Sequence, residues 1–119
     1  MESFSFKNLN VWSKSMDFAV RCFDITESFD GHFRIKEQLE ASSASVPQNI
    51  SEGHGRVSVK ENIQYLYFSR ASLNEAVTLL NILERKNFIS RELLEELESM
   101  GIEITKMLNK LISSKRKFL

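Results

Sequence analysis

The chain is 119 residues long and balances 16 lysines and arginines against 16 aspartates and glutamates. The length predicts a single domain over residues 1–119, and the balanced charge excludes a general attraction to nucleic acid or to an anionic membrane. A lone cysteine excludes an internal disulfide, and the chain lacks both a signal-peptide pattern and a membrane-spanning segment, so we expect a cytoplasmic protein with no membrane partner.

Long helix-forming segments with one proline and four glycines predict an all-α fold. The first helix is expected to end before Gly31, which supplies a left-handed turn, and the second is stopped by Gly53 and Gly55. A capping box begins the third at Ser58, and Ser90 is the expected N-cap of the fourth. The helices are therefore expected at about 8–28, 33–53, 58–86 and 90–115, and their short links predict an antiparallel up-down-up-down four-helix bundle.

The first and third expected helices carry more apolar residues than one core needs. On the third, a line that ends in Ala76, Leu79 and Leu83 runs beside the stripe Ile63, Leu66, Leu73, Val77 and Leu80. The last helix has a single stripe, made of Leu93, Leu97, Met100, Ile104, Met107, Leu108 and Leu111. The first has two, namely Leu9, Trp12, Met16, Ala19 and Phe23 beside Val11, Phe18, Cys22, Ile25 and Phe29. A second apolar face indicates packing against another subunit, although a wide core with some exposed aromatics is the alternative. We expect a homo-oligomer, with interface candidates Val11, Phe18, Cys22, Ile25, Tyr65, Leu79 and Leu83.

Small polar side chains follow the second helix at heptad spacing, at Gln38, Ser42, Ser45, Asn49, Glu52 and Arg56. A solvated face is one interpretation, but such faces are usually rich in Lys and Glu, whereas hydroxyls and amides pack closely and bond in fixed directions. The third helix has similar residues at Asn62, Ser69 and Ser72, with Glu75 nearby. We therefore predict a polar seam between the two helices in which Glu52, Arg56 and Glu75 pair. Pro47, inside the second helix, predicts a kink.

The run Gly53-His54-Gly55-Arg56 offers candidate chemistry. Its glycines precede a helix and could hold a phosphate through backbone N–H groups, or they form a simple turn, which we favour because the ending of a phosphate-binding loop is missing. The two histidines have no partners at metal-ligand spacing, so we expect no metal and no cofactor. An enzyme using Glu52, His54 and Arg56 is an alternative that would need these groups to converge on a pocket.

The C-terminal part of the last helix is basic, with Lys106, Lys110, Lys115, Arg116 and Lys117 and no acidic residue among them. Positive charge there complements the helix dipole and needs no further function. In a ring of subunits, however, the same residues would repeat around an axis and form a basic rim. They are the candidate nucleic-acid-binding residues.

Four segments together resemble the four-helix bundle protein family known from open reading frames in intervening sequences of bacterial 23S ribosomal RNA. They are FKNLNVW near the start, Gln38-Leu39, SVPQNISEGHGR at residues 45–56, and SLNEA at 72–76. The resemblance implies an antiparallel four-helix bundle, often assembled as a ring-like homopentamer, without enzymatic activity. It also implies a relationship to the accessory protein of diversity-generating retroelements, which assists a reverse transcriptase and binds nucleic acid.

The chain departs from this family's pattern in informative places. Where relatives commonly have two arginines after Gln-Leu, it has Glu40 and Ala41, which weakens a transfer of nucleic-acid binding. Ala71 replaces the usual glycine before the Ser-Leu-x-Glu run, and the customary proline near residues 29–31 is absent. The last two changes are expected to adjust local packing only.

We therefore expect a non-enzymatic, homo-oligomeric scaffold or adaptor. Its expected partners are further copies of itself and RNA, DNA or a nucleic-acid enzyme, with no small-molecule substrate. A module that binds proteins alone is the remaining alternative. The residues expected to matter most are those of the family motif and polar seam: Gln38, Ser42, Ser45, Pro47, Asn49, Glu52, Gly53, Gly55, Arg56, Ser72 and Glu75.

Overall fold

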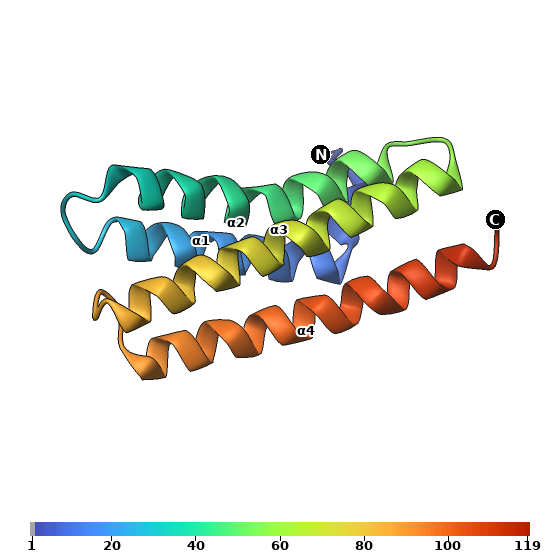
Figure 1. Ribbon diagram of the computed structural model, residues 1–119. Coiled ribbons are helices and arrows are strands. Elements are labelled where there is room, and N and C mark those ends of the chain that lie inside the picture. The colour runs from blue at the N-terminus through green and yellow to red at the C-terminus, as the bar shows by residue number, and fades with distance from the viewer. Residues whose placement is uncertain (1) are drawn as a thin grey trace.

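The computed structural model describes residues 2–119, and within them it contains helices and no strand (Figure 1). Its elements are a 3₁₀ helix η1 (Ser5–Asn8) and the α-helices α1 (Asn10–Thr26), α2 (Phe33–His54), α3 (Val59–Arg85) and α4 (Arg91–Arg116). The predicted all-α class with four helices is confirmed, and each end lies within two residues of its expected position. The short helix η1 was not predicted.

Helices that follow one another in the chain lie side by side in an elongated molecule of 46 × 31 × 22 Å. The α1–α2 and α3–α4 links lie at one end of this molecule and the α2–α3 link at the other (Figure 1). α2 and α3 share the most extensive contact, and α1 packs against both α2 and α4. This arrangement leaves the outer side of the α1–α2 pair without a covering helix.

The core is built mainly from aliphatic side chains, with Phe18 at its centre and fully buried. The stripe on α4 is rotated from the predicted one. Leu94 and Ile112 are buried, whereas the predicted Leu93 and Met107 are only partly buried. The reason is that α4 packs against both α1 and α3, so its contact face points between two partners.

The two links at the same end of the molecule pack through aromatic rings. Phe29 stacks on Phe88 with ring centroids 4.7 Å apart, and His32 meets the edge of Phe88 at 4.7 Å. Gly31 has the positive φ expected of it (74°), and His32 also adopts a left-handed conformation (φ 56°) as the residue before α2. The aromatic contacts hold His32 in this uncommon conformation.

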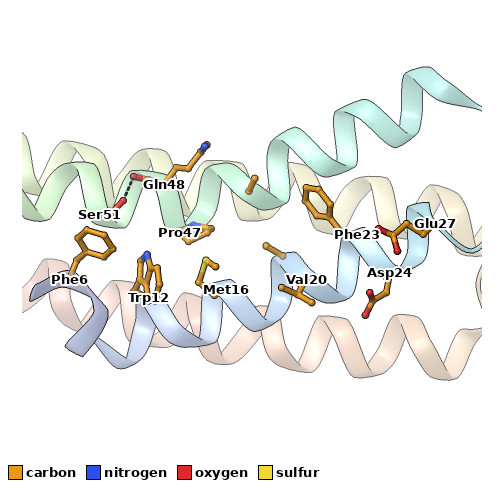
Figure 2. A pocket seen from close by; sticks show the side chains of 12 residues that line it. Phe6, Trp12, Met16, Val20, Phe23, Asp24, Glu27, Pro47, Gln48 and Ser51 are labelled. Carbon is orange, nitrogen blue, oxygen red and sulfur yellow. Dashed lines mark hydrogen bonds between the residues drawn. The ribbon is translucent and has the colours of Figure 1, made fainter. Parts of the chain in front are cut away.

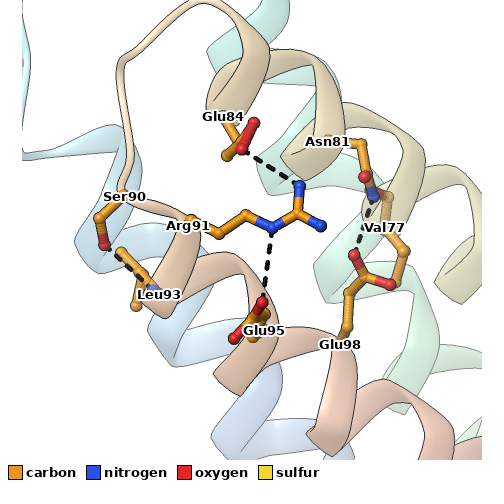
Figure 3. A network of polar contacts seen from close by, with 8 residues as sticks. All are labelled: Val77, Asn81, Glu84, Ser90, Arg91, Leu93, Glu95 and Glu98. Atoms are coloured by element: carbon orange, nitrogen blue, oxygen red, sulfur yellow. Dashed lines mark hydrogen bonds and ion pairs between the residues drawn. The ribbon is translucent and has the colours of Figure 1, made fainter.

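The α3–α4 junction is fixed by a network of polar side chains (Figure 3). Ser90 accepts a hydrogen bond from the backbone N–H of Leu93 at 3.1 Å, which confirms the expected N-cap. Arg91 pairs with Glu84 of α3 and Glu95 of α4, both at 3.4 Å. Arg91 itself is exposed, so these ion pairs contribute modestly to stability, but its pair with Glu84 joins the end of α3 to the start of α4.

None of the helices among residues 2–119 combines the length and apolar character that crossing a membrane requires.

Candidate functional site

The polar seam predicted between α2 and α3 is a set of hydrogen bonds across their interface, supported within α2 by the bond from Asn49 to Ser45. We use the term polar seam for Ser45, Asn49, Asn62, Ser69 and Ser72. Ser45 Oγ lies 2.8 Å from Ser72 Oγ, and Asn49 Nδ2 donates to Ser45 Oγ at 2.9 Å. Ser69 Oγ donates to the backbone carbonyl of Val46 at 2.8 Å, and Asn62 Nδ2 donates to that of Gly53 at 2.6 Å. Every seam residue therefore has a directed partner, which fixes the register of the two helices.

The two helices approach each other closely at Gly53. A Cβ at this position would lie 2.7 Å from Tyr65 Cβ and 3.2 Å from the carbonyl oxygen of Asn62. Only glycine permits this separation. Gly53 is thus required by packing and not by ligand binding.

Arg56 joins the end of α2 to the start of α3. Its guanidinium donates to Glu52 at 2.6 Å and to the hydroxyl of Tyr65 at 2.8 Å, and it lies 3.7 Å from Glu61. The hydrogen bond with Glu52 is the main cause that raises the pKa of Arg56. His54 instead contacts Ser5 Oγ at 3.0 Å. Of the three candidate catalytic side chains, Glu52 and Arg56 therefore pair with each other, whereas His54 bonds elsewhere, so the three do not converge.

The remaining glycine of this run belongs to the helix end. Gly55 N–H donates to Ser51, and Arg56 N–H donates to Gly53. These N–H groups are used within the last turn of α2, so the run forms a turn and offers no preformed phosphate cradle.

Other predicted motif residues are placed as follows. Ser42 is buried and bonds within its own helix to Leu39, whereas Gln38 is exposed beside Ile82. Glu75 is exposed, and no ion pair joins it to any residue in the range 2–119, so its predicted pairing with Arg56 is wrong. α2 continues through Pro47, which is buried and faces α1.

The predicted oligomer interface is corrected by the structure. Of its candidates, Val11, Phe18, Cys22, Ile25, Leu79 and Leu83 are all buried in the core of the protomer. Tyr65 is half-buried and engaged with Arg56. The two stripes of α1 were assigned the wrong way round: the stripe containing Phe18 faces the core, and the stripe containing Trp12 and Met16 faces outward.

This outward stripe forms one wall of an open apolar groove of about 570 Å³ between α1 and α2 (Figure 2). Its exposed centre is Val20, which is 54% exposed, flanked by Met16 and Phe23, each 37% exposed. Phe6 and Trp12 lie toward one end and Asp24 and Glu27 toward the other (Figure 2). The apolar groove is lined by Phe6, Trp12, Met16, Ala19, Val20, Phe23, Asp24, Glu27, Ala44, Pro47, Gln48 and Ser51.

The predicted basic residues are all on the C-terminal part of α4 or just beyond it, and all but the half-buried Lys115 are exposed. Arg116 donates to the hydroxyl of Tyr67 on α3. Arg70 of α3, which sequence analysis did not single out, lies 4.9 Å from the Tyr67 ring and donates to Asn109 of α4 at 2.7 Å. Arg70 therefore extends the basic region beside Lys106 and Lys110 and forms a basic surface with them.

Cys22 and the acidic side chains form no candidate metal site within residues 2–119. Burial of the Cys22 side chain raises the pKa of its thiol from 9.0 to about 12, with a nearby Ser43 opposing the shift. The thiol is therefore neutral at physiological pH and unsuited to act as a nucleophile.

Comparison with known proteins gives consistent matches. A model of the 23S rRNA-intervening sequence protein family matches residues 7–110. The fold is similar to the crystal structure of a protein with unknown function from the S23 ribosomal protein family of Bacteroides thetaiotaomicron. That chain is 28% identical, the match covers 86% of this chain and 97% of that one, and the TM-score is 0.79. No curated protein matches.

Proposed function

Because the chain belongs to the 23S rRNA-intervening sequence protein family, we propose that it is a non-enzymatic scaffold that self-associates and binds a macromolecular partner. The observation that carries this proposal is the apolar groove, a continuous exposed apolar surface with an aromatic end. A surface of this kind on a small protein is typical of protein–protein contact.

The energetics favour covering this groove. Full burial of a Val, Met or Phe side chain stabilises by roughly 1.5–3 kcal/mol. Val20, Met16 and Phe23 are each more than one third exposed. Covering the exposed part of all three side chains therefore contributes roughly 2–4 kcal/mol, which offsets part of the entropy lost on association. The arrangement that the family resemblance suggests is a ring of antiparallel four-helix bundles, with five subunits.

The test of self-association compares two exposed aliphatic side chains in the middle of helices. Val20 (54% exposed) lies in the apolar groove, and Ile102 (56% exposed) lies on α4 outside it. Sedimentation equilibrium is expected to give a multiple of the 13.8 kDa chain mass for the wild type. Val20→Gln is expected to weaken assembly, and Ile102→Gln to leave it unchanged. If the two variants assemble to the same extent, the groove is not the surface through which the protein self-associates.

A more specific proposal is that the macromolecular partner is a nucleic acid, and the basic surface supports it. Arg70, Lys106 and Lys110 have no carboxylate within ion-pair distance among residues 2–119. Their positive charges are therefore available to neutralise phosphates of a nucleic acid. Each phosphate neutralised releases counterions, and this release favours binding at low salt. Repetition of this surface around an assembly would increase its apparent affinity through multivalency.

Retention of labelled RNA and DNA at low and high salt tests this binding. The double variant Lys106→Ala with Lys110→Ala is expected to weaken binding. The slope of log K against the logarithm of the salt concentration is expected to become shallower by roughly 0.7–0.9 for each lysine removed. Arg85→Ala with Lys86→Ala, two exposed basic residues where α3 ends, is the matched control and is expected to change little. If wild-type protein fails to retain either nucleic acid at about 50 mM salt, this form of the function is wrong.

An enzyme built on Glu52, His54 and Arg56 is the alternative from another class. The geometry does not favour it, because Arg56 bridges Glu52, Tyr65 and Glu61 while His54 bonds to Ser5. Arg56 therefore joins Glu52 to the start of α3, and His54 links the end of α2 to η1.

A further inference from the structure

We propose that the apolar groove binds the C-terminal tail of a second copy of this chain, with Lys115 and Lys117 of the tail facing Asp24 and Glu27 of the groove. The tail is defined as residues 115–119. This inference rests on the proposed self-association and identifies the two surfaces that meet.

The groove has the character of a receptor for a cationic, apolar segment. Asp24 lies about one helical turn beyond Val20, and Glu27 about one turn beyond Phe23, so both carboxylates stand at the far end of the groove (Figure 2). Neither carboxylate forms an ion pair with any residue in the range 2–119. An apolar surface that ends in two unpaired acids excludes a phosphate-bearing ligand and favours a lysine next to an apolar side chain.

The tail has the complementary character. Phe118 is 75% exposed and Leu119 is 73% exposed, and both project beyond the end of α4. Lys115 and Lys117 precede them and have no ion-pair partner among the described residues. The tail therefore places two cations within a few residues of two exposed apolar side chains. The groove likewise places two carboxylates beside exposed apolar side chains, so charge and apolar surface can both be matched.

The tail cannot reach the groove of its own protomer. α4 ends near the α2–α3 link, whereas Asp24 and Glu27 lie near the α1–α2 link at the other end of the 46 Å molecule (Figure 1). The hydrogen bond between Arg116 and Tyr67 anchors the end of α4 against α3. Residues 117–119 reach at most about 10 Å from Arg116 even when fully extended, so Phe118 and Leu119 stay far from Asp24 and Glu27 of their own protomer. The tail that occupies a groove must therefore come from another copy.

A tail-in-groove contact joins two different surfaces of the chain. Each copy then has one free tail and one free groove, so the contact repeats until a ring closes or a filament forms. The contact also gives the basic residues near the end of α4 two different functions, self-assembly and nucleic-acid binding. Lys115 and Lys117 belong to assembly, and Lys106 and Lys110 belong to the basic surface.

Charge reversal tests this pairing by sedimentation equilibrium at low salt. The groove variant is Asp24→Lys with Glu27→Lys, and the tail variant is Lys115→Glu with Lys117→Glu. Each is expected to raise the dissociation constant of the assembly by about tenfold or more, because two attractive pairs become repulsive. The chain that carries all four changes is expected to recover assembly, because attraction is restored with opposite sign.

Two further variants separate the contributions. Phe118→Ser with Leu119→Ser is expected to weaken assembly at every salt concentration, since apolar burial is not screened. Lys106→Glu with Lys110→Glu is the charge control on the same helix and is expected to keep the wild-type mass while losing retention of nucleic acid. Circular dichroism of each variant checks that it is folded, as expected for changes outside the buried core.

The outcomes are distinguishable. A wild-type chain that stays at 13.8 kDa contradicts the proposed self-association itself. A wild type that assembles, with groove and tail variants that keep its dissociation constant, overturns the tail-in-groove pairing alone. Failure of the fourfold variant to recover assembly also overturns the pairing. If a basic apolar peptide from another source binds the groove and the tail variants assemble normally, the occupant is a different protein.

Discussion

Replacement of Gly53 by alanine tests the close packing of α2 on α3. The added Cβ would lie 2.7 Å from Tyr65 Cβ, a separation that ordinary carbon contacts do not reach, and 3.2 Å from the Asn62 carbonyl. Overpacking of this kind costs typically 1–3 kcal/mol. Alanine regains about 0.5–1 kcal/mol of helix propensity. The net loss in the free energy of unfolding is therefore up to about 2.5 kcal/mol.

Gly101 in α4 supplies the matched control. It is also helical and buried, but a Cβ there would meet its nearest neighbours, Val77 and Leu73, at 3.4 and 3.7 Å. Gly101→Ala is therefore expected to be neutral or to stabilise by up to about 1 kcal/mol through helix propensity.

Urea unfolding followed by circular dichroism measures both variants. The protomer concentration must be held fixed, because association shifts apparent stability. A Gly53→Ala protein as stable as Gly101→Ala would show that the two helices can separate without cost, and the reasoning about their close approach would be refuted.

Three more expectations concern the core and the seam. Phe18→Ala removes a fully buried ring and is expected to cost about 3–5 kcal/mol in urea unfolding, and a loss below about 1 kcal/mol would contradict its central place. Ser69→Ala removes the buried hydrogen bond to α2 and is expected to cost about 1 kcal/mol, whereas Ser113→Ala at an exposed site on α4 is expected to stay within about 0.5 kcal/mol of the wild type. The Cys22 thiol, whose pKa burial raises to about 12, stays neutral in the folded state while the unfolded thiol ionises near 9.0. Stability is therefore expected to fall as pH rises from about 9 to about 12, and to fall less in Cys22→Ala; identical pH profiles of the two proteins would refute this.

Local signals in the sequence were sufficient for the helices. Ser58 and Ser90 accept hydrogen bonds from backbone N–H groups where α3 and α4 begin, as their capping patterns predict. The polar stripe on α2 likewise identified Ser45 as a residue that meets α3, with Asn49 bonded to it within α2. Such signals depend on residues within one or two turns of each other, so no knowledge of tertiary packing is needed.

The orientation of α1 could not be predicted in the same way. Its two stripes are similarly apolar, and the choice between them depends on where α2 and α4 lie. The structure buries Phe18 and Cys22 and exposes Val20 and Met16. Arg70 was missed for a related reason, because its partners Tyr67 and Asn109 lie on two helices that only the fold brings together.

The mass of the native assembly, recorded together with its nucleic-acid content, tests the central claim most directly. Light scattering with absorbance detection on protein purified at low salt gives both quantities. The proposed function predicts a mass that is a multiple of 13.8 kDa and bound nucleic acid that high salt removes. A mass of 13.8 kDa at every concentration, with no nucleic acid, would contradict it.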